Sequence, residues 1–293
     1  MTYCPSATVP FYKMQGSGND FVVIDNRTLK LPREAMSEWA SKICPRAFGV
    51  GADGLIFLEN APEGSELDFV WHFYNADGSR AEMCGNGSRC AARLGHELGF
   101  GSRTLVFGTD AGPIHAEVSE SLDIVKVELT PPLDLALNAE LDVDGQKISV
   151  HFVNTGVPHA VTIWDDVASL DVVKLGRALR NHPHFAPAGT NVNFIEIKDK
   201  NHILIRTYER GVEGETYACG TGNAASALIA HELGLVDAEV ELTTSGNEIL
   251  NISIEKDTVF LQGKAIKTYK GEMYLEALGI TPREEMRQCA HEL

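Results

Sequence analysis

The sequence has no apolar run that approaches the roughly 20 residues that a membrane-spanning helix needs, so no membrane segment is expected. Basic residues are outnumbered by acidic ones, with 25 lysines and arginines against 41 aspartates and glutamates, which gives a net charge of −16. A surface of that sign repels nucleic-acid phosphates and anionic lipid headgroups, so neither is an expected partner. Residues 1–10 lack a charged segment followed by a long apolar core, and no signal peptide is expected there.

Cysteine is scarce, with 6 in 293 residues. So few cysteines in so long a chain do not form a disulfide framework, and they predict reduced thiols in a cytoplasmic protein. No metal site is expected, because Cys84 and Cys90 have the wrong spacing for zinc and no partner pair follows. No lysine lies in a glycine-rich setting that would suit pyridoxal phosphate, so no cofactor is expected. The rest of the composition, 44% hydrophobic and 23% charged, is that of a globular protein.

What the chain does contain is a pair of matching segments. Cys84-Gly85-Asn86-Gly87 precedes a helical apolar run, Cys90–Leu98, and Cys219-Gly220-Thr221-Gly222 precedes another, Ala224–Leu233. Each run ends in His-Glu-Leu-Gly, and the leading cysteine precedes that histidine by 12 residues in both copies (96 − 84 and 231 − 219). The long period indicates an old duplication that left one such cysteine in each half of the chain.

The two cysteine segments predict a specific chemistry. Glycines permit positive φ and a close backbone approach to a ligand, and the helix that follows directs its free N–H groups back at the loop. Such a place binds a carboxylate and stabilises a thiolate. Two of them on opposite sides of one small acid would let one cysteine remove a proton from a carbon while the other delivers a proton.

Strand and turn signals repeat in the same order in both halves, with helices predicted at residues 34–44 and 172–181. The predicted fold class is α+β, with two pseudo-symmetric domains of mostly antiparallel strands around a central helix. We expect the first domain over residues 1–130, ending at Thr130-Pro131-Pro132 and joined by a last strand at about 271–276. The second domain is expected over residues 131–270, and residues 277–293 as a short C-terminal tail.

These residues lead to a family resemblance that covers about Phe11 to Leu275. The motifs that carry it are Gly16-Ser17-Gly18-Asn19-Asp20-Phe21, Phe48-Gly49-Val50-Gly51-Ala52-Asp53-Gly54, Asn75-Ala76-Asp77-Gly78, the Cys84 segment with Arg89-Cys90, Gly156-Val157-Pro158-His159, Glu209-Arg210-Gly211, and Ala218 with the Cys219 segment. Each motif is weak alone, but their order together with the paired cysteines is specific. The chain resembles diaminopimelate epimerase, a racemase that works without pyridoxal phosphate.

The resemblance implies interconversion of LL- and meso-2,6-diaminopimelate on the route to lysine and peptidoglycan, in a cleft between the two domains. It implies Cys84 and Cys219 as the acid/base pair, with His159 and Glu209 setting their protonation. The substrate's amino and carboxylate groups would be held by Asn19, Asn75, Asn191, Glu209 and Arg210, and the carboxylate at the reacting carbon by backbone N–H groups of Gly85, Asn86, Gly220 and Thr221. The substrate is then the one expected small-molecule partner, in a possible homodimer.

Two alternatives remain open at this stage. A sister racemase would act on proline, hydroxyproline or histidine, and a non-catalytic binder would need no thiol in each half. Val157 affects the expected choice of substrate, because the family often has an asparagine at this position. Either Asn154 or Asn193 replaces the contact of that asparagine, or the distal end of the substrate is held differently. The other cysteines, Cys4, Cys44, Cys90 and Cys289, are predicted to be packing residues, and His96 and His231 to be structural residues at helix ends.

Overall fold

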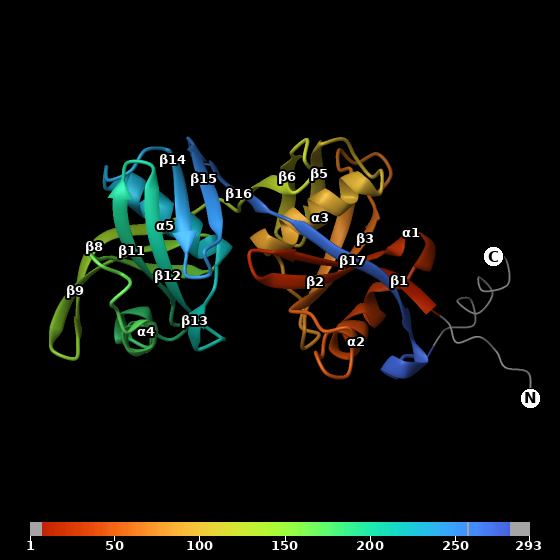
Figure 1. The fold of residues 1–293 in the computed structure, drawn as a ribbon, viewed down its shortest axis with the longest axis horizontal. Coiled ribbons are helices and arrows are strands. Elements are labelled where there is room, and N and C mark those ends of the chain that lie inside the picture. The colour runs from red at the N-terminus through yellow and green to blue at the C-terminus, as the bar shows by residue number, and fades with distance from the viewer. Residues whose placement is uncertain (1–7, 257, 282–293) are drawn as a thin grey trace, which may run out of the picture. The chain divides into compact units, whose positions relative to one another are not determined.

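The computed structural model describes residues 8–256 and 258–281 (Figure 1). The chain divides into two compact units: residues 1–125 with 265–293 form unit 1, and residues 126–264 form unit 2. The first boundary was expected after residue 130 and the second near residue 271. The second lies earlier because strand β17 (Ile266–Tyr274) pairs along its whole length with β1 (Thr8–Gly16) of unit 1. Most of the expected C-terminal tail, residues 282–293, lies outside the described residues.

In unit 1 the strands are hydrogen-bonded in the order β17-β1-β2-β3-β4-β5-β6. The pairs β2–β3 and β4–β5 are parallel and the others antiparallel. The other elements of this unit are β2 (Asn19–Asp25), α1 (Asn26–Leu29), α2 (Arg33–Ile43), β3 (Gly54–Asn60), β4 (Phe69–Asn75), α3 (Gly85–Glu97), β5 (Thr104–Thr109), β6 (Gly112–Val118) and the short η2 (Glu276–Leu278), with β7 (Ile124–Glu128) crossing into unit 2.

In unit 2 the strand order is β8-β9-β10-β11-β12-β14-β15-β16, with β10–β11 and β12–β14 parallel. The elements of this unit are β8 (Leu133–Val143), β9 (Gln146–Asn154), β10 (Pro158–Ile163), α4 (Val172–Arg180), η1 (Pro183–Phe185), β11 (Asn191–Asp199), β12 (His202–Glu209), β13 (Gly214–Thr216), α5 (Gly220–Glu232), β14 (Glu239–Thr244), β15 (Ile249–Glu255) and β16 (Thr258–Lys264). From β17 to β6 and from β8 to β15 the order and the strand directions are the same, which confirms the predicted α+β fold of two repeated halves.

Each unit wraps its sheet around one helix. Helix α5 contacts β9 and β16, which stand far apart in the strand order of unit 2, so the sheet curves around it (Figure 1). Helix α3 contacts β1 and β6 in the same way in unit 1. Both helices are buried along almost their whole length. This burial agrees with the many glycine, alanine and serine residues of both helices, because small side chains let a helix lie close to the strands around it.

Other elements follow the local patterns of the sequence. Helix α2 buries Met36, Trp39, Ala40 and Ile43, the face that its apolar spacing predicts. Strand β6 alternates exposed and buried side chains as a strand with one solvent-facing side does, whereas β3 is buried on both sides over Gly54–Leu58. No helix in the described part of the chain is long and apolar enough to cross a membrane.

Candidate active site

Cys84 is the N-cap residue of α3, with extended backbone angles of φ −151° and ψ 114°. Its sulfur accepts a hydrogen bond from the amide of Gly87 at 3.5 Å, and its carbonyl accepts the first helical bond from Ser88 at 2.7 Å. The side chain is half-buried. A thiol in this position lies at the positive end of the helix dipole, where a thiolate is stabilised.

Cys219 occupies the equivalent N-cap position of α5, with φ −124° and ψ 110°. Its carbonyl accepts the first helical bond from the amide of Asn223 at 2.9 Å. Its sulfur lies 3.5 Å from Oγ1 of Thr221, and the residue is 9% exposed. Both leading cysteines of the sequence repeat are therefore at the start of a buried 13-residue helix.

The glycines after the cysteines act differently from the expectation. The helices begin directly after the cysteines, at Gly85 and Gly220, and none of the glycines in these segments has positive φ. They belong to the first helical turn, where the absence of a side chain allows neighbouring atoms to lie close to the helix. A Cβ on Gly222 would lie 2.4 Å from Oδ1 of Asn193, whereas a Cβ on Gly87 would be in ordinary contact, 3.4 Å from Trp71.

His159 lies wholly buried on β10 and is linked to the Cys219 segment. Its Nδ1 is 3.0 Å from the side-chain amide nitrogen of Asn193, and its Nε2 is 3.0 Å from Oγ1 of Thr221. Because the amide donates to Nδ1, the ring proton is on Nε2 and points to Thr221. The hydroxyl proton of Thr221 can then be directed at the sulfur of Cys219.

The ring of His159 is neutral in this environment. Burial, with a smaller contribution from the positive charge of Arg210, lowers its pKa to about 3. Asn193 is wholly buried too, and its Oδ1 accepts a hydrogen bond from Oγ1 of Thr207 at 3.0 Å. Thr207 was not among the expected site residues, although a polar residue such as Asn193 within an apolar strand is a sign of a buried hydrogen-bond network.

In unit 1, Asn19 lies next to the Cys84 segment. Its Oδ1 accepts a hydrogen bond from the side-chain amide of Asn86 at 2.6 Å, and its Nδ2 donates to Oδ2 of Asp53 at 3.1 Å. Asn86 is 3% exposed, whereas Asn19 is half-buried. The structure therefore joins two of the expected substrate contacts by a direct hydrogen bond, and only one of them is accessible to any extent.

Asp20 has a structural task beside this pair. Its carboxylate is paired with Lys13 at 2.5 Å and with Arg46 at 2.7 Å, and Arg46 also bridges to Asp53 at 2.7 Å. Burial raises the pKa of Asp20, but the hydrogen bonds and charges of Arg46 and Lys13 outweigh this and lower it to about 2. These ion pairs join the start of β2 to β1 and to the segment before β3, which positions Asn19.

The remaining expected contacts lie at strand ends. Asn75, exposed at the end of β4, donates through its side chain to Ser79 Oγ at 3.0 Å. In unit 2, Asn191 accepts a hydrogen bond from the backbone amide of Arg210 at 2.9 Å. Glu209 ends β12 as Asn75 ends β4, and both Glu209 and Arg210 are half-buried. The guanidinium of Arg210 donates to the carbonyl of Ala188 at 3.3 Å.

Val157 is half-buried, and its neighbours differ in what they offer a ligand. Asn193 cannot supply the contact of the absent asparagine, because its amide is buried and bonded to His159, Ala160 and Thr207. Asn154 is half-buried and uses its Oδ1 to accept from the amide of Gly156 at 3.0 Å. Of the two expected replacements, only Asn154 is accessible.

Several residues that were expected to be structural are so. Burial raises the pKa of the Cys44 and Cys90 thiols to about 12, which makes them unreactive. The Nδ1 atoms of His96 and His231 lie 3.2 and 3.3 Å from backbone carbonyls just beyond the ends of their helices. Cys4 and Cys289 lie outside the described residues.

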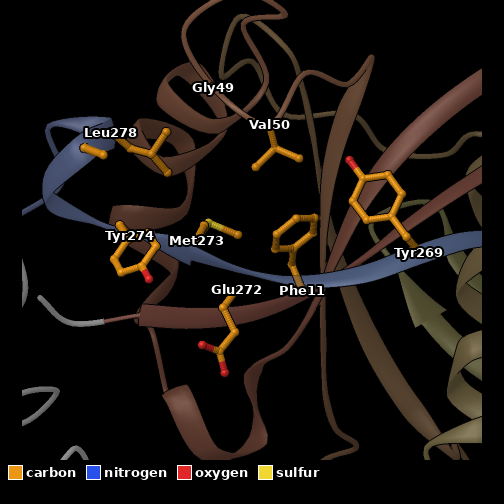
Figure 2. Close-up of a pocket in the computed structure, with 9 residues that line it drawn as sticks. Phe11, Gly49, Val50, Tyr269, Glu272, Met273, Tyr274 and Leu278 are labelled. Carbon is orange, nitrogen blue, oxygen red and sulfur yellow. The ribbon is translucent and has the colours of Figure 1, made fainter.

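An apolar pocket in unit 1 does not coincide with these residues. It has a volume of about 320 Å³ and is lined by Phe11, Val50, Tyr269, Met273 and Leu278, among others (Figure 2). None of the lining residues is one of the expected site residues. The thiols and the polar side chains bonded near them lie instead at the two helix starts.

The fold defines a broad class of proteins. It is similar to a hydroxyproline epimerase from Agrobacterium vitis (TM-score 0.67, 16% identity, 95% of this chain and 96% of the other). It is also similar to a PhzF-family phenazine biosynthesis protein from Bacillus anthracis (TM-score 0.66, 16% identity, 91% of this chain and 99% of the other). The chain thus has the two-unit fold of these proteins.

Sequence comparison gives the family within that class. The family model for diaminopimelate epimerase matches residues 11–133 and 151–268. Diaminopimelate epimerases from Aquifex aeolicus and Archaeoglobus fulgidus are 48% and 40% identical to this chain; each comparison covers 92% of it, and 99% and 98% of the respective relative. The chain belongs to the diaminopimelate epimerase family and is an isomerase of the epimerase type.

Proposed function

We propose that this protein interconverts LL- and meso-2,6-diaminopimelate, without a cofactor, in the cytoplasmic synthesis of lysine and peptidoglycan precursors. The substrate is the one in the names of the relatives at 40–48% identity, which match nearly the whole chain. In the proposed reaction, one cysteine removes the α-hydrogen as a proton and the other donates a proton to the opposite face of the same carbon.

One observation carries the mechanism. Cys84 and Cys219 are N-cap residues of equivalent helices, and each helix has the same place in its unit. Inversion of a stereocentre needs a proton to leave one face and arrive on the other, and a single fixed base returns the proton to the face that it came from. Two thiols in equivalent settings supply an acid and a base that exchange roles with the direction of the reaction.

The helix starts also provide for the charge that develops. An α-hydrogen next to a carboxylate is a weak acid, so its removal builds negative charge on the carboxylate oxygens. The free N–H groups of the first turns of α3 and α5 favour anions through the helix dipole and through direct hydrogen bonds. Fixed donors of this kind stabilise a transition state without reorganisation.

His159 acts through Thr221 in this proposal. A neutral imidazole cannot be a charged partner for a thiolate, but its Nε2–H occupies one lone pair of Thr221 Oγ1 and so orients the hydroxyl. The hydroxyl then donates to the thiolate form of Cys219, 3.5 Å away. This hydrogen bond lowers the energy of the thiolate relative to the thiol.

The activity is tested by hydrogen exchange. Purified protein incubated with LL-diaminopimelate in D₂O is expected to incorporate deuterium at the α-carbon and to form the meso isomer. L-Proline, trans-4-hydroxy-L-proline and L-histidine are tested in parallel, with no exchange expected. Activity is expected to persist after treatment with a chelator and with hydroxylamine. Exchange with one of the other amino acids and none with diaminopimelate would refute the proposed substrate.

Cysteine variants test the two-thiol mechanism. Cys84→Ser and Cys219→Ser are each expected to lower epimerisation by at least 100-fold, because an alkoxide is much harder to form than a thiolate. With a 3-halo analogue, each variant is expected to eliminate halide from the stereoisomer that its remaining cysteine attacks. The mechanism is wrong if both variants select the same isomer. Cys90→Ser, at a wholly buried position within α3, is the control for loss of a thiol.

The homodimer implied by the family resemblance remains a prediction. Light scattering coupled to size-exclusion chromatography is expected to give twice the chain mass of 31.9 kDa. A single-chain mass over the concentration range used for the activity assay would contradict it.

A further inference from the structure

Arg89 is the largest wholly buried side chain of the described residues, and the reaction proposed above does not use it. It lies on α3, five residues after Cys84 (89 − 84). The residue at the same distance from Cys219 is Ala224, so the repeat does not require an arginine there. Burial of a charge is costly unless its hydrogen bonds are made, so an arginine kept here needs a reason.

Three hydrogen bonds of Arg89 lead towards the Cys84 segment. One terminal nitrogen, Nη2, donates to Oδ1 of Asn86 at 3.0 Å and to Oγ of Ser17 at 2.8 Å. The other, Nη1, donates to the carbonyl of Gly85 at 3.5 Å. Two of these partners, Gly85 and Asn86, are the first residues after the cysteine.

The chain of hydrogen bonds continues from Asn86 to Asn19 and from Asn19 to Asp53, at 2.6 and 3.1 Å. An asparagine amide has a donor end and an acceptor end of almost the same shape, so either orientation fits sterically. A guanidinium can only donate and an ionised carboxylate can only accept. With Arg89 at one end and Asp53 at the other, only one orientation satisfies every member.

We propose that Arg89 is a positioning residue that fixes the direction of the amides of Asn86 and Asn19. This inference builds on the proposed function in one respect, namely that Asn19 contacts the substrate. In the orientation set by Arg89, Asn19 uses Oδ1 for Asn86 and one N–H for Asp53. Its second N–H remains for a carboxylate group of the substrate, and Asn19 is the half-buried end of the chain.

Without Arg89 the direction of the two amides is fixed only from the Asp53 end. The Oδ1 atom of Asn86 would have no donor from that side, and the amide would gain by turning its N–H₂ towards Ser17 and the carbonyl of Gly85. Asn86 would then present an oxygen to Oδ1 of Asn19, and the hydrogen bond between the two amides would be lost. Asn19 would keep its hydrogen bond to Asp53 but lose the donor that holds its Oδ1, so the N–H for the substrate would no longer be fixed.

The test compares two arginines of the same helix. Arg89→Met keeps the length of the side chain and removes every donor. Arg93→Met is the matched control, because Arg93 lies one turn further on, is also largely buried, and donates to Glu97 at 3.0 Å and to the carbonyl of Ala265 at 2.6 Å. Arg89→Lys restores a charged group that donates hydrogen bonds and cannot accept them. Thermal unfolding of each variant reports its structural cost.

Arg89→Met is expected to raise KM for diaminopimelate about 10- to 100-fold, the usual cost of a mismatched buried hydrogen bond, with a smaller change in kcat. Arg93→Met is expected to lower the melting temperature and to leave KM within about twofold, since it does not touch the amide chain. Arg89→Lys is expected to recover most of the loss in KM. An unchanged KM in Arg89→Met, or the same KM in Arg89→Lys and Arg89→Met, would overturn the proposal.

A second measurement does not depend on activity or on the folding of a variant. A crystal structure of the wild-type protein at about 1 Å distinguishes amide nitrogen from oxygen and shows ordered hydrogens. We expect Oδ1 of Asn86 towards Arg89 and Nδ2 of Asn19 towards Asp53. The opposite orientation of either amide would refute the inference even if the enzyme is active. If the protein does not exchange the hydrogen of diaminopimelate, the proposed function fails while this measurement still decides the direction.

Discussion

His159 and Arg89 are two residues at which the otherwise similar units differ in the charge and hydrogen bonding of their buried side chains. His159 pairs with Asn191 at the start of β11, whereas the equivalent strand position in unit 1 is Phe21, paired with Gly54. Arg89 has Ala224 as its counterpart. The Cys84 segment is thus supported by a buried cation and the Cys219 segment by a neutral imidazole. Two helix starts of the same backbone geometry therefore differ in their electrostatics.

The neutral state of His159 predicts a pH dependence of stability. Because burial lowers its folded-state pKa from the ordinary 6.5 to about 3, the unfolded chain takes up a proton below about pH 6.5 and the folded chain does not. This contribution to stability is complete above pH 6.5 and is lost as the pH falls towards 3, at up to about 1.4 kcal/mol per pH unit. His159→Gln is expected to remove that slope from urea unfolding curves recorded at pH 7, 6 and 5.

The control for that measurement is His115→Gln, which removes an exposed histidine on β6. It is expected to leave the slope of the wild type in place. If the slope of His159→Gln equals that of the wild type, His159 takes up its proton in the folded protein as readily as in the unfolded chain, and its neutral state in the folded protein is refuted.

Thr221 is expected to act through its hydroxyl and not through its shape. Thr221→Val keeps the branched side chain but cannot donate to Cys219, so it is expected to lower kcat about tenfold or more, as loss of one hydrogen bond to a charged group does. Thr221→Ser keeps the hydroxyl and is expected to stay within about threefold. The rate of Cys219 alkylation by iodoacetamide as a function of pH reports the thiolate directly. Equal rates in both variants would exclude this role.

The starts of α3 and α5 have similar backbone conformations, but the side chains packed against them differ. Gly87 faces the apolar side chains of Trp71 and Ile56, and Gly222 faces Asn193 and His159. The first position has room for a methyl group, and the second does not. The second glycine of the cysteine segment can therefore be replaced by alanine in unit 1 but not in unit 2, because different side chains lie against the two helices.

This difference predicts opposite effects of one substitution. Gly87→Ala is expected to keep or raise the melting temperature, since alanine favours a helix over glycine by up to about 1 kcal/mol and its Cβ would be 3.4 Å from the nearest atom. Gly222→Ala is expected to lower both the melting temperature and kcat, because its Cβ would lie 2.4 Å from Asn193 Oδ1 and 3.3 Å from His159. Equal melting temperatures in the two variants would contradict the packing argument.

At the scale of the whole molecule, the two units differ in how the chain builds them. Unit 2 is one continuous stretch, residues 126–264, with its own apolar core around Val150, Val192 and Tyr208. Unit 1 combines both ends of the chain, and its core includes Met273 and Leu275 beside Val22. Unit 1 is therefore complete only when β17 is present, because that strand pairs along β1.

Separate fragments are expected to reflect this difference. Residues 124–264, which include β7, are expected to fold alone and to unfold cooperatively, because their sheet and core are contained in the fragment. Residues 1–125 are expected to lack a cooperative transition, since β1 loses its neighbour and the core loses its C-terminal residues. Circular dichroism with thermal unfolding measures both. A cooperative transition in the fragment 1–125 would show that β17 contributes little.

The sequence by itself determined the paired cysteines, the family, the repeated α+β organisation and the helices α2 and α4, because spacing, periodicity and motif order are local properties of a chain. Only the tertiary structure decided where α3 and α5 begin, since their first turns are glycine-rich, a composition that is typical of loops. It also decided which polar residues meet: Asn19 and Asn86 are 67 residues apart, and His159 and Thr221 are 62 apart. The neutral charge of His159 and the direction of the Arg89 chain depend on burial and on such distant partners, and no local pattern contains that information.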